Sequence, residues 1–308
     1  MLKDVAIVIP SHNEEENVPL IYQALTDTFA KLPNYRLIVW FINDGSTDGT
    51  LCAIKTLQEQ DTNVHYINMA RAFGKEAGMY AGLSTAKADL YAVMDADLQD
   101  PPAMIPDMLA GIEAGYDMVG AARTDRTGEP PIRSFFSNMF YKIMNKISET
   151  PIVPGARDFR VMTQQVVDAV LSMSEHNRFS KGIFGWVGFN TKYLPYTNVE
   201  RKHGETSWSF WSLLRYSIDG IVNFSDVPLT IVSVLGIVSF IGAFIALAFI
   251  VIRAAIFGDP TPGWPSMVSI FLMIGGLQLF AIGIVGRYIG KIFVEVKNRP
   301  IFIAKEIK

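Results

Sequence analysis

The chain has 308 residues, half of them hydrophobic, and a formal net charge of −3 at pH 7. Such a small net charge excludes a nucleic-acid binder that relies on bulk basicity. The single cysteine, Cys52, excludes an internal disulfide, and we expect it to be a packed thiol of a helix rather than a nucleophile.

The amino-terminal part of the chain alternates short apolar runs with helical patterns. Strands are expected at residues 5–9, 37–42, 64–67, 90–94 and 118–121, and helices at 17–32, from 47 onwards, 75–86 and 102–114. Continuous apolar runs are typical of strands covered on both faces, and their alternation with helices predicts a doubly wound α/β sheet. Because ligands of such sheets bind beyond the carboxyl ends of the strands, the polar residues at those ends are the candidates for a site.

Two segments further along the chain have an amphipathic character. Residues 133–148 carry apolar side chains at helical spacing beside lysines, which predicts either a core helix or a helix on a membrane surface. Residues 207–226 show the same pattern directly before a long apolar segment. That position favours a helix at the membrane interface.

The carboxyl-terminal part contains two long apolar runs. Residues 228–252 and 260–285 carry no charge. At about 1.5 Å of rise per residue, each run exceeds a hydrocarbon core of roughly 30 Å. We therefore predict transmembrane helices at about 228–252 and 264–286, with a buried core hairpin as the alternative. Basic residues follow the second run, which predicts that the tail and the amino-terminal domain both face the cytoplasm.

Two carboxylates, Asp95 and Asp97, follow the strand predicted at 90–94, and Gln99 adds a neutral oxygen. Oxygen ligands of this kind suit a hard divalent cation, so the loop predicts a site for Mg²⁺ or Mn²⁺ that also binds a substrate pyrophosphate. A solvated turn would carry the same residues. The sequence holds no thiolate–histidine cluster for zinc.

Polar residues also follow the first two predicted strands. Pro10, Asn13 and Glu14 come after the first strand, and Asp44 ends the second in the run NDGSTDG. Such a run is a good turn and helix cap, and it can also present a carboxylate to a ligand. Both roles stay open at this point.

Four segments taken in order resemble family 2 glycosyltransferases of the GT-A fold: residues 9–14 (IPSHNE), 43–48 (NDGSTD), 71–76 (RAFGKE) and 94–102 (MDADLQDPP). The chain is most similar to polyprenyl-phosphate hexosyltransferases, namely bactoprenol glucosyltransferases and dolichol-phosphate mannose synthases. The resemblance spans the whole chain. It implies a cytoplasmic GT-A catalytic domain at 1–206, an interfacial helix at 207–226, and two transmembrane helices with a basic tail at 227–308.

The resemblance also implies roles for individual residues. Those implied to bind the nucleotide sugar are Pro10, Asn13, Glu14, Asp44, Lys75, Asp95 and Gln99, and the implied metal ligands are Asp95, Asp97 and Gln99. The candidate catalytic residues are Asp97, Asp158 and Arg160, with Asp158 as a base or an orienting group. The residues implied to contact the acceptor phosphate or the diphosphate are Arg123, Arg178, Arg201 and His203. The chain departs from the family pattern at Ala72, usually Asn, and at Ser207, usually Lys.

The activity that the resemblance implies is inverting transfer of a hexose onto undecaprenyl or another polyprenyl phosphate. The product would be a lipid-linked sugar donor for modification of cell-envelope glycans. Glucose from UDP-glucose is favoured, and UDP-N-acetylglucosamine, UDP-galactose and GDP-mannose stay open. A homo-oligomer is expected, with a tetramer as one option, and no nucleic-acid partner.

Three alternatives are weighed against this reading. A processive polysaccharide synthase would carry a Gln-x-x-Arg-Trp motif, and no tryptophan of the chain follows an arginine. A non-catalytic membrane scaffold or lipid-binding subunit predicts a broken metal motif, whereas Asp95 and Asp97 are both present. A transporter is disfavoured because two uncharged spans offer no pathway.

Overall fold

A computed structural model describes residues 2–124, 153, 155–197, 222, 225, 227–257 and 263–308. The chain divides into two compact units, Met1–Gly220 with Arg299–Lys308, and Ile221–Asn298. The amphipathic helix predicted at 133–148 lies outside the described residues, as does nearly all of the helix predicted at 207–226. Both stay predictions.

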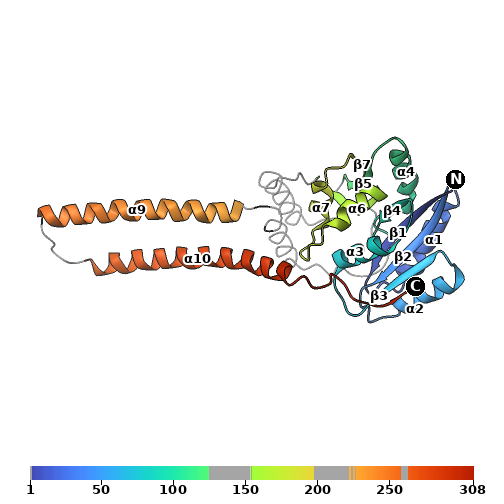
Figure 1. Cartoon of the computed structure of the whole chain (residues 1–308), viewed down its shortest axis with the longest axis horizontal. Coiled ribbons are helices and arrows are strands. Elements are labelled where there is room, and N and C mark those ends of the chain that lie inside the picture. The colour runs from blue at the N-terminus through green and yellow to red at the C-terminus, as the bar shows by residue number, and fades with distance from the viewer. Residues whose placement is uncertain are drawn as a thin grey trace. The chain divides into compact units, whose positions relative to one another are not determined.

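The first unit contains an eight-stranded sheet with the strand order β7-β5-β6-β4-β1-β2-β3-β8 (Figure 1). Its centre consists of four parallel strands: β4 (Leu90–Val93), β1 (Lys3–Ser11), β2 (Tyr35–Asn43) and β3 (Val64–Met69). On one side follow β6 (Ala156–Thr163), antiparallel to both neighbours, then β5 (Met118–Arg123) and, parallel to it, β7 (Thr191–Tyr196). This confirms the predicted α/β class with a mostly parallel sheet.

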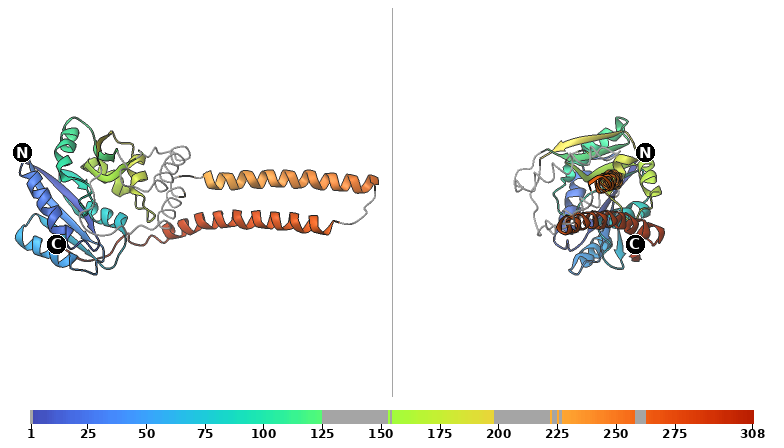
Figure 2. Two further views of the ribbon diagram at one scale, coloured as in Figure 1. Left: turned by 180° about the vertical axis from the view of Figure 1, so that it is seen from behind. Right: turned by 90° about the vertical axis from the view of Figure 1, so that its left-hand side faces the viewer.

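Helices cover both faces of the sheet, as the two views in Figure 2 also show. The described helices of this unit are α1 (Asn17–Phe29), α2 (Thr50–Gln60), α3 (Lys75–Thr85), the short 3₁₀ helix η1 (Pro102–Met104), α4 (Ile105–Glu113), α6 (Gln164–Ser172) and α7 (Ser180–Trp186). Side chains of α1, α2 and α4 pack against Val5, Ile7 and Ile9 of β1 in one core cluster. The continuous burial of residues 5–9 therefore follows from helices on both sides.

Helix α3 lies on the opposite face of β1 and approaches it closely. A Cβ atom added at Gly82 would lie 2.2 Å from Cγ1 of Val8, and one added at Gly78 would lie 3.2 Å from Cβ of Pro10. The two glycines, one turn apart, therefore permit the backbone of α3 to rest on the strand. This contact fixes the amino-terminal end of α3, and with it Lys75, at the carboxyl end of β1.

The carboxyl-terminal segment adds strand β8 (Ala304–Ile307) to the edge of the sheet, antiparallel to β3. The backbone N–H of Tyr66 donates to the carbonyl of Lys308 at 2.9 Å, and Lys55 of α2 forms an ion pair with Glu306 at 2.8 Å. The sequence analysis predicted only a basic tail here. Residues distant in sequence thus complete the sheet.

The second unit consists of two long helices, α9 (Val227–Phe257) and α10 (Trp264–Val296). Within the described part of the chain, one segment, Val227–Ala246, is long and apolar enough to cross a membrane. Helices form where both spans were predicted, and each extends beyond the predicted end.

Cys52 was expected to be a packed thiol, and this prediction is wrong. The cysteine is exposed on α2. The buried side chains of that helix are Thr50, Ile54 and Leu57. Cys52 therefore lies off the helix face that meets the sheet.

Candidate active site

The loop after β4 carries the predicted metal ligands and has an unusual backbone. Leu98 is buried and adopts a positive φ of 60°, a region that a leucine rarely occupies. This turn lets a side-chain oxygen of Asp97 accept a hydrogen bond from the backbone N–H of Gln99 at 3.1 Å. The packing of Leu98 in the core thus holds Asp97 and Gln99 in one tight turn beyond the central strands.

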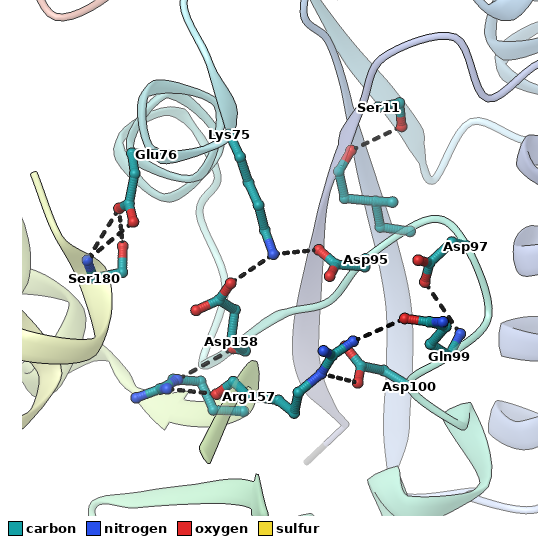
Figure 3. A network of polar contacts seen from close by, with 12 residues as sticks. Ser11, Lys75, Glu76, Asp95, Asp97, Gln99, Asp100, Arg157, Asp158 and Ser180 are labelled. Atoms are coloured by element: carbon teal, nitrogen blue, oxygen red, sulfur yellow. Dashed lines mark hydrogen bonds and ion pairs between the residues drawn. The ribbon is translucent and has the colours of Figure 1, made fainter. Parts of the chain in front are cut away.

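Lys75 connects this loop with the neighbouring strand β6. Its ammonium nitrogen lies 2.6 Å from Oδ1 of Asp95 and 2.5 Å from Oδ2 of Asp158 (Figure 3). Desolvation opposes the charge of Lys75, but the carboxylates of Asp158 and Asp95 outweigh it and raise the pKa of the ammonium. Burial likewise opposes the charge of Asp158, and Lys75 outweighs it and holds the pKa of that carboxyl well below its usual range. Lys75 and Asp158 are therefore both charged at neutral pH.

A second network links the same loop to β6 and β7. Arg157 donates to Oδ1 of Asp100 and to the side-chain oxygen of Gln99, both at 3.3 Å (Figure 3). The hydroxyl of Tyr196 donates to Asp100 at 3.0 Å. Asp100 is fully buried, and burial raises its pKa to about 6 against the opposing effect of Arg157. Its Oδ2 finds no hydrogen-bond partner within the described part of the chain. The network orients the side chain of Gln99 from outside the loop.

Glu76, the residue after Lys75, fixes the start of α7. Its carboxylate accepts hydrogen bonds from the backbone N–H and the hydroxyl of Ser180. Burial, and next to it the charge of Asp158, raise the pKa of Glu76. Two successive residues of α3 therefore hold two elements of the second half of the domain, Lys75 through Asp158 and Glu76 through Ser180.

Arg160, a predicted catalytic residue, is only 1 % exposed. Its guanidinium donates to the backbone oxygens of Asp158 at 3.2 Å and Arg157 at 2.7 Å, and it stacks on the ring of Phe184 at 3.8 Å. Burial lowers its pKa. These contacts direct the guanidinium at the backbone that carries Arg157 and Asp158.

Asp44 receives the loop that precedes α3. Its two carboxylate oxygens accept hydrogen bonds from the backbone N–H groups of Phe73 at 2.6 Å and Gly74 at 2.8 Å. Gly45 has a φ of 63°, and a Cβ there would lie 2.4 Å from the backbone nitrogen of Ala72. The segments around Asp44 and Ala72, both predicted to lie near the nucleotide, are thus in direct contact.

The first predicted motif packs against the second. Asn13 has a φ of 57°, and its side-chain oxygen accepts a hydrogen bond from the N–H of Thr47 at 2.8 Å. Glu14 accepts a hydrogen bond from the side chain of Asn17 at 2.6 Å. These contacts stabilise the turns at the carboxyl ends of β1 and β2, whereas neither α1 nor α2 has a side-chain hydrogen bond at its N-cap residue.

The predicted acceptor residues do not all converge. Arg178 donates to the backbone oxygens of Met173 and Val170 at the end of α6, and its guanidinium lies 4.7 Å from the ring centre of Tyr80. Arg123 ends β5, where its backbone N–H donates to Gly155. Arg201 and His203 lie outside the described residues and stay predictions.

The loop can hold a divalent cation only with help from other ligands. In the described ranges, no group of three His, Cys, Asp or Glu side chains is placed to bind one ion. Asp95, Asp97 and Gln99 offer hard oxygen atoms, and Mg²⁺ in particular keeps several ligands from water or substrate phosphates. The ammonium of Lys75 already places one positive charge against Asp95 and Asp158. The residues therefore fit a metal shared with a substrate.

Four residues of the site were assigned no role from the sequence: Glu76, Asp100, Arg157 and Tyr196. Asp100 directly follows Gln99, and Arg157 precedes Asp158, so adjacency to a predicted residue was an available signal. Tyr196 carries no such signal, because β7 places its hydroxyl on Asp100 from 96 residues away.

A parallel α/β sheet with an Asp-x-Asp turn beyond a central strand defines a GT-A-like nucleotide-sugar transferase fold. A mannosyltransferase from Pyrobaculum calidifontis, solved with GDP-mannose and Mn²⁺, shares this fold with a TM-score of 0.51 at 14% identity, over 97% of this chain and 87% of the other. The family model of glycosyl transferase family 2 matches residues 6–171. The chain belongs to this family and is a glycosyltransferase.

Curated relatives match nearly the entire chain. A putative glycosyltransferase, CsbB of Bacillus subtilis, is 42% identical over 98% of this chain and 91% of its own length. A prophage bactoprenol glucosyl transferase homolog of Escherichia coli is 39% identical over 99% of both chains. A prophage-derived bactoprenol glucosyl transferase of Shigella flexneri is 38% identical over 98% of this chain and 97% of its own. The similarity therefore includes the segments after the family 2 domain.

Proposed function

We propose that the protein transfers a hexose, with glucose from UDP-glucose favoured, onto undecaprenyl or another polyprenyl phosphate with inversion at the anomeric carbon. The observation that carries the proposal is the meeting of Asp95 with Asp158 at Lys75, which joins the predicted donor side to the predicted acceptor side. The names of the bactoprenol relatives support the choice of sugar and lipid. The product would serve as a lipid-linked sugar donor for cell-envelope glycans.

The donor nucleotide is proposed to lie along the carboxyl ends of β1 and β2, and its diphosphate beside the loop after β4. Asp95, Asp97 and Gln99 would hold Mg²⁺ or Mn²⁺ there. When bound, the cation would neutralise the charge of the departing nucleoside diphosphate. Leu98 fixes the turn of this loop, and Arg157 holds the side chain of Gln99 by a hydrogen bond to its oxygen.

On the acceptor side, an oxygen of the lipid phosphate attacks the anomeric carbon while the bond from that carbon to the diphosphate oxygen breaks. A phosphate monoester has a second pKa of about 6, so the attacking oxygen already carries negative charge at neutral pH. It therefore needs no strong base. Asp158, ionised and paired with Lys75, is better suited to orient the acceptor than to remove a proton.

The acceptor lipid requires a membrane, and the apolar segment Val227–Ala246 supports one crossing. We propose α10 as a second crossing, so that the catalytic domain and the carboxyl terminus share the cytoplasmic side of the inner membrane. The segments predicted at 133–148 and 207–226 would lie at the interface. Self-association, with a tetramer as one option, belongs to this proposal.

The proposal is tested with the full-length protein in detergent and undecaprenyl phosphate. Four labelled donors are compared: UDP-glucose, UDP-N-acetylglucosamine, UDP-galactose and GDP-mannose. We expect one donor to give a labelled, acid-labile lipid, and EDTA to abolish its formation. If free nucleoside diphosphate is released but no lipid is labelled, the acceptor is not a polyprenyl phosphate. If the protein turns over none of the four donors, a non-catalytic scaffold is favoured.

A further inference from the structure

We propose that Lys75 is a positioning residue that occupies Asp95 in the donor-free enzyme and yields this carboxylate to the divalent cation that accompanies the donor. The inference deepens the proposed function and rests on it. In this proposal Lys75 moves from a shared contact with Asp95 and Asp158 to Asp158 alone, and it does not need to contact the nucleotide. Asp158 is the partner that Lys75 keeps.

The ammonium of Lys75 and a divalent cation would compete for the carboxylate of Asp95. Lys75 lies 2.6 Å from an oxygen of Asp95, which is a predicted metal ligand. A divalent cation on the same carboxylate would bring a second positive centre within a few ångströms of the ammonium, and like charges so close repel each other strongly. Binding of the cation and full pairing of Lys75 with Asp95 therefore disfavour one another.

Lys75 has both the freedom and the alternative partner that an exchange needs. Its side chain is 39 % exposed, and its four-carbon stem can move the ammonium without moving α3. Asp158 lies only 2.5 Å from the ammonium, on strand β6 and not on the loop that carries Asp95. Lys75 can therefore leave Asp95 and stay paired with Asp158.

The exchange would connect the two halves of the reaction. While the donor is absent, Lys75 pairs with Asp95 and Asp158 together and reduces their mutual repulsion. After the donor arrives, the full charge of Lys75 faces Asp158 on the acceptor side. Occupation of the donor site would thereby set the orientation of Asp158 toward the lipid phosphate.

The test is a titration of the full-length protein with Mn²⁺ in the absence of acceptor, once with UDP and once without it. Electron paramagnetic resonance measures the free and bound Mn²⁺ at each step. Lys75→Met removes the competing charge, and we expect it to bind Mn²⁺ at least about fivefold more tightly than the wild type without UDP. Lys75→Arg keeps the charge and should stay near the wild type. Lys55→Met, which removes a lysine paired with Glu306 outside the site, is the matched control.

A purely structural ion pair predicts a different result. In that case Lys75→Met would bind Mn²⁺ as well as or less tightly than the wild type, and either finding overturns the inference while leaving the proposed function intact. Wild-type protein that binds no Mn²⁺ even with UDP would instead overturn the proposed metal site, and the exchange with it. Thermal melting of each variant verifies that the compared proteins are folded.

Discussion

At the scale of single residues, the site is a balance of buried and partly buried charges. Lys75 pairs with two carboxylates, and Arg157 donates hydrogen bonds to Asp100 and Gln99. Arg160 donates a hydrogen bond to the backbone oxygen of Arg157. Loss of one partner leaves the remaining charge poorly compensated in a place that water reaches incompletely. Substitutions here should therefore change stability as well as activity.

Asp158→Asn tests this balance through its pH dependence. Because Lys75 holds the pKa of Asp158 below the ordinary value of 3.8, the ionised carboxylate stabilises the fold above that pH, and this contribution disappears as the pH falls further. We expect Asp158→Asn to lower the free energy of unfolding by about 2 kcal/mol at pH 7. The loss stays this small because Asp95 still pairs with Lys75. The melting temperature of Asp158→Asn should lie below that of the wild type by a constant difference from pH 7 to about pH 5. This difference should narrow below about pH 4.

The exposed Asp168→Asn on α6 is the control for this measurement. It replaces the same side chain where solvent screens the charge, so its melting temperature should follow that of the wild type. A gap for Asp158→Asn that is absent at pH 7, or that grows in acid, would contradict the assigned charge state.

At the scale of elements, the site depends on how closely α3 rests on β1. A methyl group at Gly82 would overlap Val8, so Gly82→Ala should destabilise the catalytic domain by about 2 kcal/mol. The displaced helix carries Lys75, and sugar transfer should fall as well. Thermal melting measures the first effect, and partial recovery in Gly82→Ala with Val8→Ala would identify the overlap as the cause.

Gly236→Ala of α9 is the matched control, because within the described residues nothing outside its own stretch of helix lies within 4 Å of the added methyl group. It should leave the melting temperature of the catalytic domain unchanged. A Gly82→Ala protein as stable as this control would show that α3 does not lie as close to β1 as described.

Strand β8 makes a separate prediction at the same scale. Deletion of residues 304–308 removes the carbonyl of Lys308 that accepts a hydrogen bond from Tyr66. Hydrogen exchange of the β3 segment should then become faster, because its edge is open to water. Glu306→Gln loses the ion pairs with Lys55 and Lys308 but keeps the backbone of β8, so the protection of β3 should persist. If the deletion variant exchanges its β3 amides no faster than the wild type, β8 does not pair with β3.

At the scale of the whole molecule, the sequence predicts what depends on local pattern. The apolar runs and the residues that end them are local, so the central strands and the Asp95–Asp97 turn could be placed in advance. Strands β6 and β8 pair antiparallel across long sequence separations, and no local pattern reveals such partners. For the same reason the contacts of Tyr196 with Asp100 and of Arg178 with the end of α6 required the structure.

The most direct measurement is mass spectrometry of the lipid formed from UDP-glucose and undecaprenyl phosphate. The wild type and Asp168→Asn should produce undecaprenyl phosphate enlarged by one hexose. We expect Asp97→Asn to lose at least about a hundredfold in rate, because the amide would hold less tightly the cation that neutralises the leaving group. An unmodified lipid with every donor, or an Asp97→Asn variant as active as the wild type, would contradict metal-assisted transfer to a polyprenyl phosphate.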